Sequence, residues 1–423
     1  MTDAGKPARE RAVKRLLCLL LWPLLALALG GCGHRPGSAL HTTVLLAYGV
    51  SSDEAFTSDL QDVLRERMEG LEQGFQALHP GVRIRVLAFP EDRIAEKLRQ
   101  LQASGLAPDL INVDDTTAQQ LHGDALLRTV RMPSSVVAPL DPAMLRLLRR
   151  PDGALFGLPL VLRPQLACYD RRKMVRSPDT LAELLSVASA GVRVGLPLDP
   201  LSLAWTSGAT GALPALSAAA AGAPLDVSQH QRVRDWLTWL LGADLQQRVT
   251  FYAGQEQLVQ QLAAGSLDWI SCRSNQVLAL RQRLGDRLGL APLPSGPGGA
   301  PSPLSRQRVL VFGRSSSPAQ ARATEALAAF VVSPLIQRSL TLTSLDLLPA
   351  NRQVTPPATA GSSLAALLAA QAQTDALPSD TWMDRLSPTQ ERRIKGVLVG
   401  LLFGEVDTAQ AADQVIAALQ GRR

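Results

Sequence analysis

The sequence predicts an α/β protein in which mostly parallel sheets are flanked by helices. From residue 43 onward, short apolar segments of β-prone residues alternate with segments of helical periodicity, which is typical of such folds. The chain has 423 residues, of which 46% are apolar and 19% charged, an ordinary composition for a globular protein. This length exceeds what one hydrophobic core usually covers, so we expect two domains.

The first five elements follow in the order strand, helix, strand, helix, strand. Gly105 ends the second helix, because a glycine adopts the left-handed conformation of a helix cap without steric cost. Asp114 and Asp115 directly follow the third strand. Ligands of such sheets gather at the carboxyl ends of strands, so both aspartates lie where a site is expected. The five segments are 43–48, 51–78, 82–89, 91–105 and 109–113.

The rest of the chain continues this alternation. Thr180 and Glu183 have the spacing of a capping box and predict the start of a helix. Trp236 and Trp239 lie three residues apart in a helical stretch and are expected in a core. Further strands are predicted at 192–197, from 289 and at 309–312, and helices at 318–330 and through most of 364–419.

The N-terminal segment has the three parts of an export signal, namely cations, an apolar stretch and small residues. The apolar stretch, residues 16–29, has 14 residues and contains Pro23. A membrane-spanning helix needs roughly 18 or more apolar residues, so a signal sequence fits better than a membrane helix or a buried helix. The cations that precede the stretch are Lys6, Arg9, Arg11, Lys14 and Arg15.

Residues 29–32, Leu-Gly-Gly-Cys, resemble a bacterial lipobox. In that motif the cysteine thiol carries a diacylglycerol and the cysteine becomes the mature N-terminus after cleavage. The resemblance implies that residues 1–31 are a lipoprotein signal peptide and that residues 32–41, with lipid on Cys32, are a flexible tether. We therefore expect an exported protein that is anchored to a membrane by lipid and faces the periplasm or the cell exterior.

Charge and cysteine content narrow the function classes. The net charge is +6, but residues 1–31 hold five Lys and Arg against two Asp and Glu, so the remainder carries +3 and nucleic-acid binding is not indicated. Cys168 and Cys272 would remain in an oxidising compartment, either as a disulfide or as two separately buried thiols. The sequence contains no CxxC, HExxH or cluster of ligand-spaced histidines, so we predict no metal site and no cofactor.

Several short stretches resemble, in their order and spacing, the extracellular solute-binding proteins of ABC importers, family 1, the maltose-binding-like group. Each stretch is weak by itself, but together they extend over roughly residues 43–418. The resemblance implies a two-lobed periplasmic-binding-protein-like fold of type II. The stretches are 75–82 (FQALHPGV), 103–105 with 107–109, 157–159, 262–265, 291–294 and 348–350.

The same resemblance implies a division of the chain and a function. Residues 42–162 with 309–346 would form lobe 1, and residues 163–308 with 347–423 would form lobe 2. A carbohydrate-type solute, such as a mono- or disaccharide, a glycoside or a compatible solute, would be enclosed as the lobes close and then be passed to ABC permease subunits. A monomer without catalytic activity is expected. The crossings between the lobes are expected near 163–168, 305–309 and 346–352.

Polar residues near the first crossing are the expected ligand contacts of lobe 1. Sugar hydroxyls donate and accept hydrogen bonds, so carboxylates, Arg and Asn match them, and aromatic faces cover the C–H patches. Asp114 and Asp115 fit this role, although either could instead cap the next helix. Arg163 and Gln165 could bind the solute or form a structural contact between the lobes. Tyr48, at the end of the first strand, would form one wall of the site.

In lobe 2, Asp199 follows a strand at a place where maltose-binding relatives carry an acidic residue, which implies a ligand contact. Trp205 lies nearby at helical spacing, so core packing is equally open. Trp269 stands where the family has a smaller or more flexible residue, which would reshape the floor of the site. The other contacts expected from this segment are Arg273 and Asn275.

Trp382 lies in a C-terminal region where sugar-binding relatives place a stacking aromatic, so stacking is favoured over core packing. Aromatic residues make up 4% of the chain, which favours a small enclosed pocket over a long groove.

Two other functions stay open. A binder of a non-sugar solute such as a polyamine could use Asp114, Asp115 and Asp199 with Trp382. A secreted glycoside-acting enzyme would need a carboxylate pair, but a chain with 37 acids offers many pairs.

Overall fold

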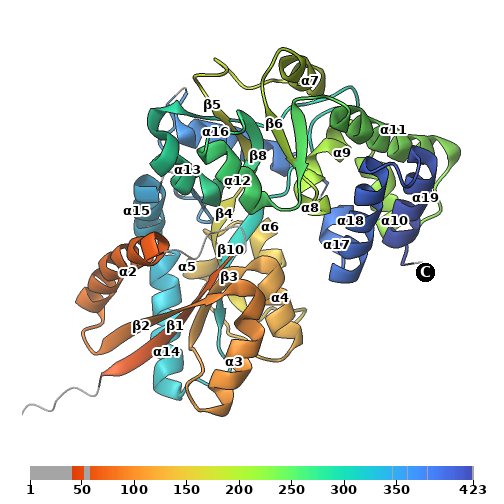
Figure 1. Cartoon of the computed structure of the whole chain (residues 1–423). Coiled ribbons are helices and arrows are strands. Elements are labelled where there is room, and N and C mark those ends of the chain that lie inside the picture. The colour runs from red at the N-terminus through yellow and green to blue at the C-terminus, as the bar shows by residue number, and fades with distance from the viewer. Residues whose placement is uncertain (1–40, 52–57, 345, 360, 379, 422–423) are drawn as a thin grey trace, which may run out of the picture.

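The structure is a computed structural model that describes residues 41–421 except 52–57, 345, 360 and 379. The predicted signal peptide, Cys32 and most of the predicted tether lie outside the described residues. The described strands form two sheets, one in each of two lobes that lie one above the other in Figure 1.

Lobe 1 contains a six-stranded sheet in the order β11-β4-β10-β3-β1-β2. Strands β1, β2 and β3 pair in parallel, whereas β10 runs antiparallel to both of its neighbours. The strands are β1 (Thr42–Val50), β2 (Val82–Pro90), β3 (Leu110–Asp114), β4 (Gly157–Arg163), β10 (Arg306–Phe312) and β11 (Leu348–Pro349).

Lobe 2 contains a five-stranded sheet in the order β7-β6-β8-β5-β9. Strands β6, β7 and β8 are parallel, and β5 is antiparallel to β8 and β9. The strands are β5 (Gln165–Asp170), β6 (Val194–Pro197), β7 (Val249–Tyr252), β8 (Trp269–Arg273) and β9 (Leu288–Ala291).

Both sheets are therefore mixed, where mostly parallel sheets were predicted. The antiparallel members β5 and β10 are the strands by which the chain enters a lobe. β4 ends at the carboxyl edge of the first sheet, and after Pro164 the chain starts β5 at the facing edge of the second sheet. A strand that starts at the carboxyl edge must run antiparallel to the neighbouring strands that end at that edge.

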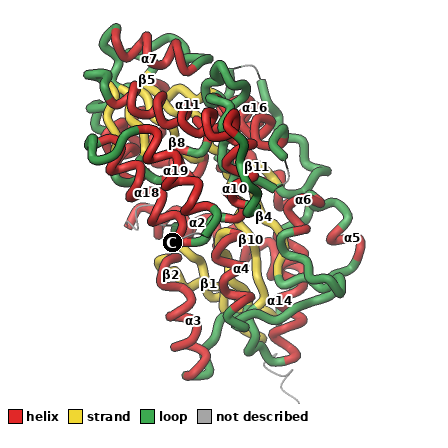
Figure 2. The backbone as a smooth tube through the Cα atoms, turned by 90° about the vertical axis from the view of Figure 1, so that its right-hand side faces the viewer, coloured by secondary structure: helices red, strands yellow, loops and turns green. Residues whose placement is uncertain are grey.

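Helices cover both faces of each sheet, as Figure 2 shows from the side. Those of lobe 1 are α2 (Ser58–Leu78), η1 (Glu91–Arg93), α3 (Ile94–Ala103), α4 (Asp115–Gly123), α5 (Ser134–Val137), α6 (Pro142–Arg146), α14 (Pro318–Val331) and α15 (Pro334–Ser344). Those of lobe 2 are α7 (Leu181–Ser189), α8 (Pro200–Leu203), α9 (Trp205–Ala209), α10 (Leu213–Ala220), α11 (Val227–Asp244), α12 (Gln255–Ala263), η2 (Ser274–Gln276), α13 (Val277–Leu284), η3 (Gly285–Arg287), α16 (Ser363–Asp375), α17 (Trp382–Arg385), α18 (Pro388–Leu402) and α19 (Thr408–Leu419).

Local sequence signals mark several of these ends. Thr180 caps α7 by accepting a hydrogen bond from the Glu183 amide, as predicted. Ser317 and Gln320 form a complete capping box at α14, with Pro318 at its first position. Gly105, after α3, has a φ of 73°, the left-handed conformation expected there.

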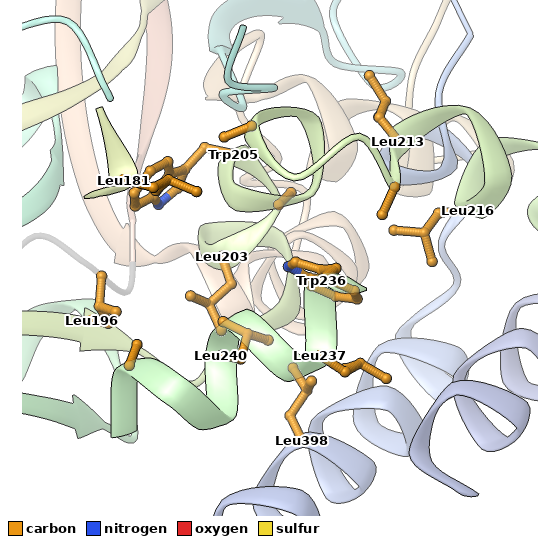
Figure 3. Close-up of a cluster of buried hydrophobic side chains, with 14 of the residues drawn as sticks. Leu181, Leu196, Leu203, Trp205, Leu213, Leu216, Trp236, Leu237, Leu240 and Leu398 are labelled. Carbon is orange, nitrogen blue, oxygen red and sulfur yellow. The ribbon is translucent and has the colours of Figure 1, made fainter. Parts of the chain in front are cut away.

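The alternation of side chains along the strands gives lobe 1 two buried faces. On β3, Leu110 packs against α2 and α14, while Ile111 packs on the opposite face against α3 and α4. In lobe 2 one apolar cluster includes residues of α7 to α11 and of α17 to α19, and a second includes residues of α12, α13 and α16. Figure 3 shows part of the first, with Trp205 and Trp236 among leucines. Trp236 is fully buried and Trp239 partly buried against this cluster, which confirms their core assignment.

Two crossings differ in detail from the expected boundaries. β10 belongs to the first sheet from Arg306 onward, three residues before the predicted start of that segment. β11 still pairs with β4 in lobe 1, so residues 348 and 349 belong to lobe 1, although lobe 2 was predicted to begin at 347, and the third crossing lies beyond residue 349, within the predicted range 346–352. The assignment of the remaining residues to the two lobes stays a prediction.

Among the described residues no single helix is long and apolar enough to cross a membrane, and α14 with α15 passes that test only as a pair bent by 59°.

Candidate functional site

Polar side chains gather where the carboxyl edges of the two sheets meet. The edge of lobe 1 is formed by the ends of β1 to β4 and the start of β10, and the edge of lobe 2 by the ends of β6 to β8. The Pro164 carbonyl accepts a hydrogen bond from the Ser274 amide just beyond β8, so the first crossing lies against the lobe 2 edge. In α/β sheets this is the edge at which ligands bind.

Arg308 is the centre of the lobe 1 edge. It is 1% exposed, and its guanidinium donates to the Asp114 carboxylate at 3.1 Å, to the Gly49 carbonyl at 2.6 Å and to the Asn112 carbonyl at 2.8 Å. It also donates to Glu91 and, at 2.9 Å, to the side-chain oxygen of Asn112. A buried charge is tolerated only when it is paired in this way.

The two acids beside Arg308 respond differently to burial. Desolvation raises the pKa of Glu91 above its ordinary value, and Arg308 only partly opposes this rise. Burial acts in the same direction on Asp114, but the Arg308 and Arg163 guanidiniums outweigh it and hold the pKa of that carboxyl below its usual value. Asp114 is thus held as an anion by two arginines, and its side chain does not cap α4, which was the other predicted role. Asp114 is partly exposed, and its ligand contact stays a prediction.

Tyr48 and Arg163 lie beside this network. The Arg308 guanidinium lies 5.0 Å from the centre of the Tyr48 ring, a cation–π contact that fixes the ring at the edge of the sheet. Arg163, at the end of β4, lies 3.7 Å from the Asp114 carboxylate and 3.4 Å from the Ser51 hydroxyl. Both predicted residues are therefore at the site, held by contacts within lobe 1.

Asp115 and Arg306 form the outer part of the same edge. Burial raises the pKa of Asp115 to about 6, and the positive charge of Arg306 partly opposes this rise. The Asp115 carboxylate accepts a hydrogen bond from the Thr116 amide and is also in contact with the Gln307 side chain. Asp115 is partly exposed, so it stays a candidate ligand contact.

Gln165 has a structural role instead of the predicted ligand contact. Its amide nitrogen donates to the Ser202 carbonyl at 2.7 Å, and its oxygen accepts from the Leu304 amide at 3.1 Å. Both ends of the side chain are thus used within the protein, and the residue is 1% exposed. Gln165 therefore joins the first and second crossings.

Arg273 and Asn275, two of the predicted contacts, lie at and just beyond the carboxyl end of β8. The Arg273 guanidinium donates to the Ser202 hydroxyl at 3.1 Å. Arg273 and Asn275 are both partly exposed. They remain candidate contacts on the lobe 2 side.

Asp199 and Glu391 form a carboxyl pair in lobe 2. Asp199 caps α8 by accepting from the Ser202 amide at 2.7 Å. Burial and the neighbouring Asp199 raise the pKa of Glu391, on α18, to about 7, against the opposing charges of Arg306 and Lys395. Arg306 therefore acts electrostatically on acids of both lobes.

The three tryptophans among the predicted contacts are core residues. Trp205 and Trp269 are fully buried, and Trp382 is 1% exposed. Trp205 lies 6.2 Å from Trp269 between ring centres, and Trp382 lies 6.5 Å from Trp236. For Trp205 this is the core alternative that was left open, whereas the ligand contacts predicted for Trp269 and Trp382 are wrong. Large apolar rings at core-facing positions gain more from packing than from lining a polar edge.

Cys168 and Cys272 form a disulfide, with their Cα atoms 5.8 Å apart. The sequence had left open whether these cysteines form a disulfide or stay two separately buried thiols, and the structure has the disulfide. The bridge joins diagonal positions of β5 and β8, because Leu166 is the direct partner of Cys272. The next pair along the ladder is Gln165 with Arg273, so the bridge fixes the two strands directly beside the polar edge.

Four residues of the site were not predicted from the sequence, namely Arg306, Arg308, Glu91 and Glu391. The order Arg306-Gln307-Arg308 at the start of an apolar strand was a usable signal, because alternate residues share a face and two cations there need anions. Glu391 gave no such signal, since a glutamate in the first turn of a helix is ordinarily exposed.

The described residues contain no group of three His, Cys, Asp or Glu that could hold a metal ion.

The family model described as bacterial extracellular solute-binding protein matches residues 72–366. The chain belongs to this family. The resemblance to solute-binding proteins and the two-lobed type II fold are thereby confirmed. A search of curated proteins finds no match.

Solved structures of other solute-binding proteins share the fold at low sequence identity. The GacH receptor of Streptomyces glaucescens, solved unliganded and with acarbose, has a TM-score of 0.69 and 16% identity over 91% of this chain and 100% of its own. The sugar-binding protein MalE of Xanthomonas citri has a TM-score of 0.63 and 19% identity over 90% and 97%. UgpB of Mycobacterium tuberculosis, solved with glycerophosphocholine, has a TM-score of 0.64 and 16% identity over 84% and 94%.

Proposed function

We propose that this solute-binding protein is the lipid-anchored receptor of an ABC importer and that it captures a small carbohydrate-type solute between its lobes. Family membership supports the receptor role. The observation that carries the proposal is the convergence of polar groups from both lobes at the crossings, with Arg306 acting on Asp115 of one lobe and Glu391 of the other. The structural relatives in complex with acarbose and glycerophosphocholine support a hydroxyl-bearing solute.

The candidate contacts are polar side chains at the two edges, and all of them are partly exposed except Arg163, which is 6% exposed. Carboxylates and guanidiniums suit a sugar, because ring hydroxyls need both acceptors and donors. We place no tryptophan among them, so the hydrogen bonds carry the specificity. The proposed contacts are Tyr48, Asp115, Arg163, Asp199, Arg273, Asn275, Arg306 and Glu391.

Delivery to permease subunits at the membrane and the lipid on Cys32 belong to the same proposal. A receptor that is tethered beside its permease works at a high local concentration. The chain is proposed to act as a monomer without cofactor or catalysis. Incubation with p-nitrophenyl glycosides should therefore release no nitrophenol, and turnover would favour a glycoside-acting enzyme.

A cationic solute is the second candidate, and one observation favours it. Asp115, Asp199 and Glu391 are acids at one site, and burial raises the pKa of two of them, so a bound cation would relieve their repulsion. The arginines at the same edge weigh against this candidate, because they already supply positive charge.

A thermal-shift panel separates the two candidates. We expect maltose, trehalose, glucose, tagatose or glycerophosphocholine to raise the melting temperature, because a ligand that binds only the native state stabilises it by mass action. Spermidine and putrescine should leave it unchanged. A shift with the polyamines alone would reject the carbohydrate class and keep the receptor role.

A further inference from the structure

Two glutamine side chains at the lobe 2 edge bury polar atoms that have no hydrogen-bond partner among the described residues. They are the Oε1 atom of Gln255, the first residue of α12, and the Nε2 atom of Gln276, the last residue of η2. Gln255 is 7% exposed and Gln276 is 2% exposed. An unsatisfied buried polar atom loses its hydrogen bonds to water without replacement, so native structures rarely keep such groups without a reason.

The hydrogen bonds of these side chains fix which end of each amide is unpaired. The Gln276 oxygen accepts from the Arg273 amide at 2.9 Å and from Gln255 Nε2 at 3.3 Å. Gln255 Nε2 also donates to the Ser271 carbonyl at 2.7 Å. Turning either amide over would bring donor against donor or acceptor against acceptor. The unpaired atoms are therefore one acceptor and one donor on two adjoining amides.

The surroundings supply further hydrogen-bonding groups, and there is open space beside Gly254, the residue before Gln255. The Ser274 hydroxyl, two residues before Gln276, is fully buried and also lacks a partner among the described residues. α12 begins at Gly254 without a side-chain cap, so amides of its first turn add donors. A Cβ atom built on Gly254 would meet no other atom within 4 Å, which shows open space beside the glycine.

The chemistry of these groups selects a neutral hydroxyl. A hydroxyl donates one hydrogen bond and accepts others, so one group can donate to Gln255 Oε1 and accept from Gln276 Nε2. An ammonium group would leave the Gln276 donor unpaired, and a carboxylate would leave the Gln255 acceptor unpaired.

We propose that Gln255, Ser274 and Gln276 form a subsite of lobe 2 that binds one hydroxyl group of the solute. This rests on the proposed function, because it places part of a carbohydrate-type ligand at the carboxyl ends of β7 and β8. The subsite makes affinity depend on the presence of one particular hydroxyl. It acts through neutral amides, separately from the charged groups of the lobe 1 edge.

The test replaces an amide by an apolar side chain of similar length. Gln276→Met and Gln255→Met are compared with wild type by calorimetry, using maltose, trehalose, glucose and tagatose as probes. A sugar that binds wild type should bind either variant at least tenfold more weakly. The melting temperature of the ligand-free variants should fall less than that of a variant that loses an amide bonded at both ends, because each variant removes bonded atoms together with an atom that is unpaired in the free protein.

Gln337→Met is the matched control in lobe 1. Gln337 is 1% exposed, and its amide is bonded at both ends, to the Val331 carbonyl at 3.3 Å and the Ala350 amide at 2.9 Å. This variant should lower the melting temperature and leave sugar affinity unchanged.

The other outcomes are separable. If wild type binds a sugar and the Gln255 and Gln276 variants bind it equally well, the subsite is rejected and the proposed function stands. If both variants lose stability but keep affinity, the amides serve the fold only, and the subsite is again rejected. If no sugar of the panel binds wild type, the carbohydrate function is rejected and the subsite with it.

Discussion

The charged residues at the site divide into a fixed group and a titrating group. Arg308, with Glu91, Asp114 and the carbonyls around it, has its hydrogen-bonding capacity used within lobe 1 and is 1% exposed. It holds the ends of β1, β2 and β3 together from the start of β10. Asp115 and Glu391 are acids whose burial is less well compensated, so their protonation responds to pH near neutrality.

We predict that Glu391→Gln raises stability above pH 7 and flattens its pH dependence. The pKa of Glu391 rises from its ordinary value of 4.5 to about 7 in the folded state, so the folded protein holds this proton more tightly than the unfolded chain. Stability therefore falls as pH rises from about 4.5 to about 7, and above that range ionisation costs at most about 3 kcal/mol.

Melting temperatures of wild type and variant between pH 5 and pH 8 check this prediction. The two curves should converge at pH 5 and separate with increasing pH, with the variant higher. Glu256→Gln, in the first turn of α12 with an exposed side chain, is the control and should follow wild type. A variant curve that runs parallel to wild type over the whole range would contradict the role of Glu391.

At the scale of elements, the crossing from β4 to β5 shows how local order builds the site. Pro164 separates a strand that ends in one lobe from a strand that begins in the other. Arg163 is therefore held in lobe 1, while Gln165 is held by Ser202 and Leu304. The disulfide between β5 and β8 then fixes the strand pair that carries the lobe 2 edge.

The disulfide should contribute substantially to stability. Its cysteines are 104 residues apart in sequence, and closing a loop of roughly 100 residues restricts the unfolded chain by about 4–5 kcal/mol in the chain-entropy model. The double variant Cys168→Ala with Cys272→Ala should have a free energy of unfolding that is lower than that of wild type by this amount, as measured by urea denaturation. Wild type with its disulfide reduced should unfold at nearly the same urea concentration as the double variant. If the double variant loses less than about 1 kcal/mol of unfolding free energy, the bridge is dispensable.

At the scale of the whole molecule, two lobes joined by crossing segments allow the facing edges to approach or separate. Hinge closure around a ligand is common in proteins of this architecture. Side chains from both lobes lie at the crossings, so a solute that bridges Asp115 and the Asp199–Glu391 pair would favour the closed arrangement. Such a ligand shifts the equilibrium by its preference for the closed state.

The proposed anchor predicts a change of location without a change of binding. Cys32→Ser removes the thiol that would carry lipid, and residue 32 precedes β1 in sequence. We expect the variant to appear in the fraction released from membranes, with the melting temperature and ligand shift of wild type. Fractionation of cells followed by the thermal-shift panel measures both, and a variant that stays on membranes would contradict the lipid anchor.

Much of the fold could be predicted from the sequence, because strand and helix signals are local. The elements from β1 to β3, the cap at Thr180 and the solute-binding family all followed from spacing and motif order. The candidate site was predicted only in part. Asp115 follows a strand as expected, and Arg273 and Asn275 lie at the end of β8, a strand that was not predicted, whereas Trp205 and Trp269 are in the core.

The sequence by itself determined the elements, the family and the expected export signal, since each depends on residues close together in the chain. Only the tertiary structure decided which polar groups meet. Glu91 and Arg308 are 217 residues apart, and they meet because the ends of β2 and β3 and the start of β10 lie at the same edge of one sheet. The free energy of burying a tryptophan or pairing a charge depends on such distant neighbours. Periodicity along the chain does not contain that information.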